Sequence, residues 1–86
     1  MSARTVDEIA AVLVGFINRE IMAPGHTVTA AESLDAAGVD SMALLKVLLF
    51  IERTFGFWVP DEDLVDAHVS TAERLARYVV ARGAAR

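Results

Sequence analysis

The sequence contains no cysteine among its 86 residues. This excludes a disulfide framework, a thiolate metal site and a thiol nucleophile supplied by the protein itself. The two histidines, His26 and His68, have no ligand-type partner three or four residues further on, so we expect both at the surface and predict no metal site.

Long apolar segments and an excess of positive charge are also missing. No run of 18 apolar residues exists, and no basic stretch leads into an apolar segment near the start of the sequence. We therefore expect a cytoplasmic protein without membrane contact. The formal net charge of −4 argues against nucleic-acid binding as the main task.

The residues that are present favour a folded chain. Hydrophobic residues make up 55% of the sequence and charged residues only 23%, a composition that excludes disorder. The length suits one small domain, so we predict a single domain over residues 1–86.

The N-terminal third predicts one amphipathic helix and a long loop. Thr5 and Glu8 fit a capping box, and apolar residues then recur at helical spacing to about Met22. Pro24 and Gly25 end this helix. A polar loop follows from His26 to Asp40, with room for a short helical turn over 29–34.

The second helix is predicted from Ser41 to Gly56 and is apolar on two sides. One side, predicted to face the core, carries Leu44, Val47, Leu48, Ile51 and Phe55. The nearly opposite side carries Met42, Leu45 and Leu49, edged by Lys46, Glu52 and Arg53. This second stripe is either covered by the long loop or exposed as a partner site. Phe50 lies between the stripes and is not assigned to either.

The C-terminal third predicts two further helices. A packed connection over 57–59 precedes a short helix from Asp61 to about Ala67, and Ser70 to Glu73 fits a second capping box before the last helix. The fold prediction is an all-α antiparallel four-helix bundle, with three long helices, one short one and a long loop between the first two. The predicted core is Val6, Ile9, Leu13, Phe16, Leu34, Val47, Leu48, Ile51, Phe55, Val59, Leu75 and Val79.

Ser41 is the candidate functional residue because it places a hydroxyl at a helix N-terminus beside Asp40. Such a serine is either the N-cap of the helix or an exposed attachment point, since the helix dipole favours a phosphate there. Catalysis by the chain alone is not expected. No histidine adjoins Ser41 in the sequence, and Asp40 is poorly placed as its base because adjacent helical positions do not face each other.

Three segments carry a resemblance to a known family: Gly38–Met42 before an apolar helix, Phe55-Gly56 at its end, and Val59–Asp63 after it. Together they resemble an acyl carrier protein over about residues 33–80. The resemblance implies that a magnesium-dependent phosphopantetheinyl transferase moves 4′-phosphopantetheine from coenzyme A onto Ser41. It also implies that Asp40 helps to present the loop to the transferase, and that Met42, Leu45 and Leu49 contact partner enzymes.

The second helix departs from the fatty-acid carriers of this family. Lys46 and Arg53 stand where those carriers have acidic residues, so with Glu52 the helix carries a net charge of +1. A discrete carrier of a polyketide or nonribosomal peptide pathway fits better, and a D-alanyl or peptidyl carrier is the alternative. The implied partners are the transferase, an adenylating enzyme or acyltransferase that loads the arm, and a downstream synthase. We expect a monomer that docks through Met42, Leu45, Lys46, Leu49 and Arg53.

Two acidic segments flank Ser41 in the sequence and could steer a basic partner toward it. A different class of function is also open at this point. A non-covalent adaptor would use the apolar face of the second helix to bind a partner helix, and it would need no modified serine.

Overall fold

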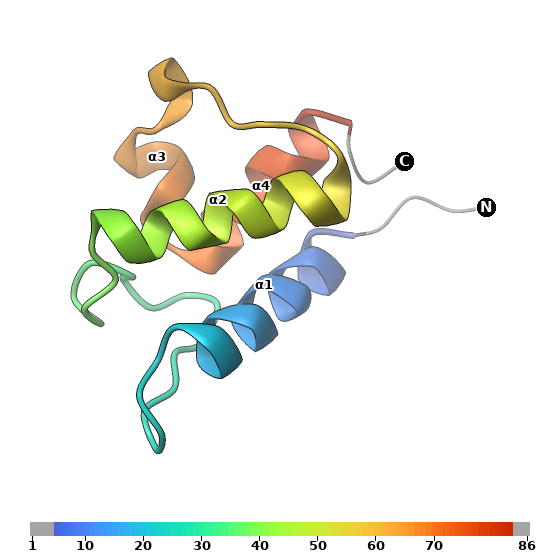
Figure 1. Cartoon of the computed structure of the whole chain (residues 1–86). Coiled ribbons are helices and arrows are strands. Elements are labelled where there is room, and N and C mark those ends of the chain that lie inside the picture. Colours follow the sequence, from blue (N-terminus) through green and yellow to red (C-terminus); the bar gives the residue numbers. More distant parts are fainter. Residues whose placement is uncertain (1–4, 84–86) are drawn as a thin grey trace.

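All regular structure in the described part of the chain, residues 5–83 of this computed structural model, is helical (Figure 1). The predicted all-α fold, with three long helices and one short one, is therefore confirmed. Residues 1–4 and 84–86 of the predicted domain lie outside the described range. Among the described residues, no helix is long and apolar enough to cross a membrane. The elements are α1 (Val6–Glu20), α2 (Ser41–Phe55), the 3₁₀ helix η1 (Asp61–Asp63), α3 (Asp66–Val69) and α4 (Ala72–Ala81).

The capping box predicted for α1 is present. The Glu8 backbone N–H donates to the Thr5 hydroxyl at 3.1 Å, and the Thr5 N–H donates to the Glu8 carboxylate at 2.7 Å. The helix ends at Glu20, slightly earlier than predicted. The N–H groups of Ile21 and Met22 both donate to the Ile17 carbonyl, which closes the last turn and directs the chain out of the helix.

The short helix predicted from Asp61 to about Ala67 is wrong in its extent. The segment forms two elements, η1 and α3, separated by Leu64 and Val65 in non-helical conformations. Leu64 is half-buried against the core, and its inward packing interrupts a continuous helix at this point.

The second predicted capping box is also wrong. Thr71 caps α4, and its hydroxyl accepts the Arg74 N–H at 3.0 Å. Ser70 instead closes α3, because its own N–H donates back to the Asp66 carbonyl.

The core forms where α1, α2 and α4 meet, and α1 and α2 run in opposite directions (Figure 1). Val6, Phe16 and Phe55, which were predicted to belong to it, are only partly buried and pack at its edge. Phe50, which the sequence left unassigned, stacks on Phe16 with ring centroids 4.2 Å apart. The buried hydrophobic residues are Ile9, Ala10, Leu13, Ile17, Val28, Leu34, Val39, Val47, Leu48, Ile51, Val59, Ala72, Leu75, Ala76, Tyr78 and Val79.

The loop over 21–40 contains turns but no helix, so the short helical turn expected at 29–34 is absent there. It is nevertheless tied to the helices. The Asn18 side chain on α1 makes two hydrogen bonds with the backbone of Val28. Further along, the Leu34 N–H donates to the Ser70 carbonyl at 2.9 Å. The first pair of bonds holds the loop against α1, and the second contact holds it at the junction of α3 and α4, so that together they position the start of α2.

Candidate functional site

The N-terminus of α2 is capped by Asp40. Its carboxylate accepts the Ala43 N–H at 2.9 Å, and its backbone is extended, as expected of an N-cap. Ser41 is the first residue inside the helix, and its side chain is exposed. The possibility that Ser41 serves as the N-cap is therefore wrong. Its hydroxyl is left at the positive end of a 15-residue helix without a capping task.

A tight turn delivers the chain to this position. The Ser33 hydroxyl accepts the Ala36 N–H at 3.1 Å, and the Val39 N–H donates to the Leu34 carbonyl at 2.9 Å. Gly38 has φ +96°, a left-handed conformation that side chains disfavour. Because Leu34 and Val39 are both buried, the turn is anchored on either side. Asp40 and Ser41 thus follow a fixed segment of backbone.

An open cavity of about 560 Å³ lies beside the start of α2. Ser41 and Asp40 line it from α2 and its cap, the loop contributes a second wall, and α3 with Ser70 contributes the third. Its volume is within the range of about 300–1,000 Å³ that is usual for ligand sites. The described residues that line it are Ser33, Leu34, Asp35, Val39, Asp40, Ser41, Leu44, Asp66, Val69 and Ser70.

The lining combines apolar side chains with hydroxyls and three carboxylates, those of Asp35, Asp40 and Asp66. It includes no histidine, cysteine, lysine or arginine from the described part of the chain. Ser41 thus has neither an imidazole base nor a cation beside it that would activate its oxygen as a nucleophile. The described residues also contain no group of three side chains suited to a metal ion.

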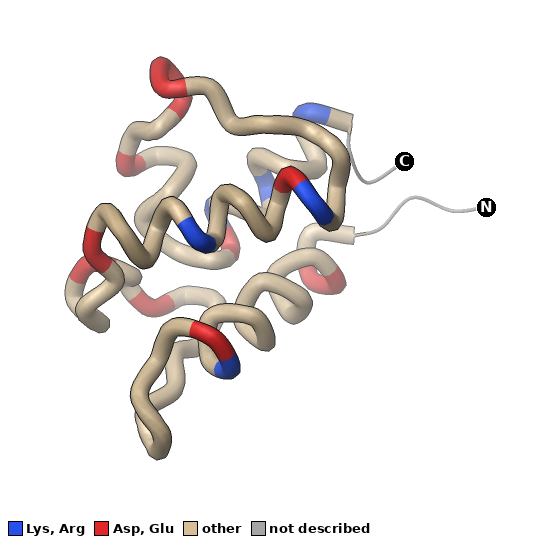
Figure 2. Tube along the Cα trace, viewed as in Figure 1, with Lys and Arg blue, Asp and Glu red and all other residues tan. Residues whose placement is uncertain are grey.

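Charge is distributed unevenly around the site. Figure 2 shows acidic positions gathered at the end of the molecule where α2 begins, and again in the segment of η1. On α2 itself the charged residues are Lys46, Glu52 and Arg53. The end of α2 that carries Ser41 is therefore acidic and the remainder of the helix is weakly basic, which agrees with the charge pattern seen in the sequence.

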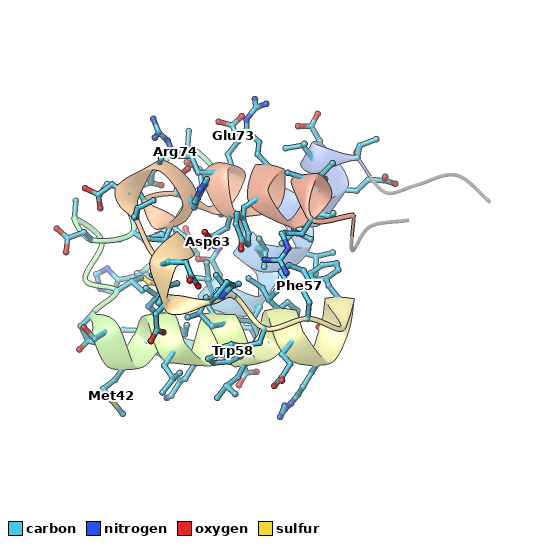
Figure 3. All side chains as sticks on the ribbon, turned by 90° about the horizontal axis from the view of Figure 1, so that it is seen from above. Met42, Phe57, Trp58, Asp63, Glu73 and Arg74 are labelled. Carbon is cyan, nitrogen blue, oxygen red and sulfur yellow. The ribbon has the colours of Figure 1, made fainter. Side chains whose placement is uncertain are left out.

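The outer stripe of α2 is exposed. Met42 is 69% exposed, Leu45 40% and Leu49 43%, so the loop over 21–40 does not cover them. In Figure 3 the Met42 side chain points away from the rest of the molecule. Of the two arrangements left open by the sequence, the structure shows the exposed one. Exposed apolar residues gathered on one helix face are typical of a partner site.

The candidate site residues fall into separate places. Asp40 and Ser41 border the 560 Å³ cavity. Lys46, Leu49 and Arg53 line a second, smaller groove between α1 and α2. Met42 and Leu45 border neither hollow and form the ridge of α2.

A polar cluster on the far side of the core could not be found from the sequence. The partly buried hydroxyl of Tyr78 donates to Asp63 and accepts from Arg82 at 2.8 Å, and Arg82 approaches Asp63 at 3.7 Å. Burial, and secondly the hydrogen bond to Asp63, raise the pKa of the Tyr78 phenol, while Arg82 opposes the shift. The cluster ties η1 to α4, and Figure 3 shows Asp63 beside that helix. The cluster thereby holds η1 in place, the segment that precedes the cavity wall formed by α3.

Neither histidine lines the cavity at Ser41. His26 is exposed as expected, whereas His68 is half-buried with its ring 4.9 Å from the Tyr78 ring. The cavity residues Ser33, Asp35, Asp66 and Ser70 were also not predicted. They come from two segments, the loop before α2 and α3 with its C-cap, which only the fold brings together, so the sequence next to Ser41 contains no signal for them.

One comparison with known proteins identifies the family. The model of the family described as "Phosphopantetheine attachment site" matches residues 7–79, a range that contains α2, the cavity and most of α4. Comparisons with curated proteins and with solved structures gave no match. Domains of this family are non-catalytic carriers of acyl groups, and their cofactor is covalent 4′-phosphopantetheine. The chain therefore belongs to the phosphopantetheine attachment-site family of carrier domains.

Proposed function

We propose that the chain is an acyl or aminoacyl carrier that holds biosynthetic intermediates as thioesters on a 4′-phosphopantetheine arm attached to Ser41. The observation that carries this proposal is the exposure of Ser41 at the first position of α2. Asp40, and not Ser41, caps the helix, so the Ser41 hydroxyl is not used in capping, and Ser41 borders an open cavity.

The residues around Ser41 fit the covalent group. A phosphodiester at this position lies at the positive end of the α2 dipole, which stabilises negative charge. Asp40 fixes the backbone at the attachment point through its bond to Ala43. Leu44 and Val69 give the cavity an apolar side, and Ser33 and Ser70 give it hydroxyls. The arm supplies the thiol that the cysteine-free chain lacks, and tethering raises the effective concentration of cargo at a docked enzyme.

A specialised pathway, making a polyketide or a nonribosomal peptide, is the setting that we propose. Support comes from the charges of α2 itself, where Lys46 and Arg53 outweigh Glu52, so this helix offers no acidic patch to a basic enzyme surface. The partners in this proposal are a phosphopantetheinyl transferase, a loading enzyme of the adenylating or acyltransferase type, and a downstream synthase. The chain itself acts as a monomer without catalytic activity.

The partner surface that we propose is the outer side of α2, formed by Met42, Leu45, Lys46, Leu49 and Arg53. The exposure of Met42, Leu45 and Leu49 supports it. Interfaces of this kind rely on a few apolar anchors surrounded by a polar rim.

Incubation with coenzyme A and a broad-specificity phosphopantetheinyl transferase tests the attachment. Intact-mass measurement should show one added phosphopantetheine on the wild-type chain and none on Ser41→Ala. Ser70→Ala is a matched control, because Ser70 borders the same cavity, and it should be modified like the wild type. An unmodified wild-type chain, or a modified Ser41→Ala variant, would exclude the proposal. A non-covalent adaptor would keep its partner binding in Ser41→Ala.

A further inference from the structure

The groove between α1 and α2 is separate from the cavity at Ser41. Its volume is about 290 Å³, and none of the described residues that line it also borders the cavity. This volume lies at the lower limit of the range of about 300–1,000 Å³ for small-molecule sites, so the groove suits inserted side chains better than a free ligand. Its lining is Phe16, Glu20, Lys46, Leu49, Phe50 and Arg53.

The apolar part of the groove is firmly supported. Phe16 of α1 and Phe50 of α2 stack with their ring planes inclined by 18°, and both rings are partly buried against the core. Leu49, which is 43% exposed, continues the apolar surface out to solvent. A bulky apolar side chain placed here would cover Leu49 and contact the exposed part of the rings.

Two cations flank this apolar surface. Lys46 precedes Leu49 by three residues and Arg53 follows it by four, so all three share one face of α2. Two helical turns, about 10 Å, separate the two cations along the helix. Within residues 5–83, no carboxylate lies within ion-pair distance of Lys46 or Arg53. Among the described residues that line the groove, Glu20 is the only acid, and it is paired with Arg19 at 3.3 Å.

The charge of the groove is opposite to that of the whole chain. The formal net charge is −4, and Figure 2 shows most acidic positions away from the middle and the end of α2. An acidic partner would be repelled by the region around Ser41 and attracted by the groove. Charge complementarity of this kind selects a partner and fixes its orientation.

We propose that the groove is the docking site for an acidic amphipathic helix of the loading enzyme. This helix inserts one bulky apolar side chain between Leu49 and the Phe16–Phe50 stack. It places carboxylates one turn before and one turn after that side chain, beside Lys46 and Arg53. Insertion of an apolar helix face into a groove is a recurrent mode of recognition. The inference rests on the proposed carrier function, and it adds α1 to the surface proposed on α2.

Synthetic helical peptides of about 14 residues, long enough for nearly four turns, provide the probe. The first peptide carries a central leucine with a glutamate one turn to each side. A second has lysines in place of the glutamates, and a third has serine in place of the leucine. Each is titrated into the isotopically labelled full chain, apo and phosphopantetheinylated, while backbone amide shifts are followed by NMR.

The acidic leucine peptide should shift the amides of Leu49, Phe50 and Arg53 saturably, and the lysine and serine peptides should bind at least about tenfold more weakly. The double variant Lys46→Glu/Arg53→Glu should lose about tenfold in affinity. Arg74→Glu is the charge-matched control. Arg74 lies exposed on α4, on the side opposite α2 in Figure 3, and its reversal should leave binding unchanged.

Three results would overturn the docking proposal: no saturable shift with the acidic peptide, equal binding of the lysine peptide, or shifts confined to the ridge of Met42 and Leu45. The peptide needs no arm for binding. Retained binding on a chain that the transferase cannot modify therefore contradicts the carrier function alone, and a modified chain without binding contradicts the groove alone.

Discussion

The two apolar faces of α2 differ in what they contact, although their sequences look alike. Val47 and Ile51 are completely buried against the core, whereas Met42, Leu45 and Leu49 remain 40–69% exposed on the other side of the same helix. The first face stabilises the fold. The second contributes little to it and is left available to a partner. Similar residues thus have different tasks because one face packs against α1 and α4 and the other faces solvent.

The largest effect should come from the buried face. Ile51→Ala removes a side chain of 0% exposure and should lower the free energy of unfolding by about 2–5 kcal/mol, because a cavity remains in a packed core. Denaturant unfolding measures it. Phe55→Ala should cost less, since Phe55 is only partly buried. A loss below about 0.5 kcal/mol for Ile51→Ala would show that the two faces have been assigned the wrong way round.

On the exposed face, Leu45→Ala should affect function more than stability. Truncation of one interface anchor commonly costs above about 1 kcal/mol of binding, whereas the free energy of unfolding should change by less than that amount. Loading kinetics on the phosphopantetheinylated chain check the first value and denaturant unfolding the second. Val65→Ala is the matched control, because Val65 is 46% exposed but does not lie on α2. A Leu45→Ala variant that is loaded at the wild-type rate but is markedly destabilised would contradict the proposal that the exposed face serves binding and not stability.

The hydrogen bonds of Tyr78 should contribute less to the free energy of unfolding than a fully buried apolar side chain does. Tyr78→Phe should cost about 0.5–1.5 kcal/mol at neutral pH, since it removes the hydrogen bonds with Asp63 and Arg82. The folded-state pKa of Tyr78 is raised above the ordinary value of 10.0, so this contribution is fully present below pH 10.0 and is lost as pH rises through the folded-state pKa. Unfolding of both proteins across this range measures the difference. A difference that grows above pH 10.0 would contradict the direction of the shift.

The smallest effect should come from the rim of the exposed face. Lys46→Glu should slow loading by reducing the association rate, and the reduction should shrink as salt screens the charge. Loading rates at low and high ionic strength measure it, with Arg74→Glu on α4 as a charge-matched comparison. Equal slowing by both variants would indicate a response to net charge rather than to this face.

Much of the fold could be predicted from local patterns. The spacing of apolar residues located α1, α2 and α4, and the capping box at Thr5 is present as predicted. The errors fall where tertiary contacts overrule local signals. Leu64 packs inward and divides the predicted third helix, and Ser70 closes α3, which leaves Thr71 to cap α4.

The candidate site also contains one part that the local sequence predicts and another that depends on tertiary contacts. Ser41 and Asp40 could be predicted as site residues because they are adjacent in the sequence and match a family pattern. The walls of the cavity were not, since Ser33 and Ser70 meet there only through the bond between Leu34 and Ser70. The groove was missed because the periodicity of α2 alone gives no information about the Phe16 ring of α1 that stacks against Phe50.

Location of the modified residue is the most direct measurement of the carrier function. After incubation with coenzyme A and transferase, the wild-type chain is digested and its peptides are fragmented by tandem mass spectrometry. The phosphopantetheine should lie entirely on Ser41, the exposed first residue of α2. Modification at Ser33 or Ser70 of the same cavity, or no modified peptide at all, would contradict the assignment of Ser41 as the attachment site.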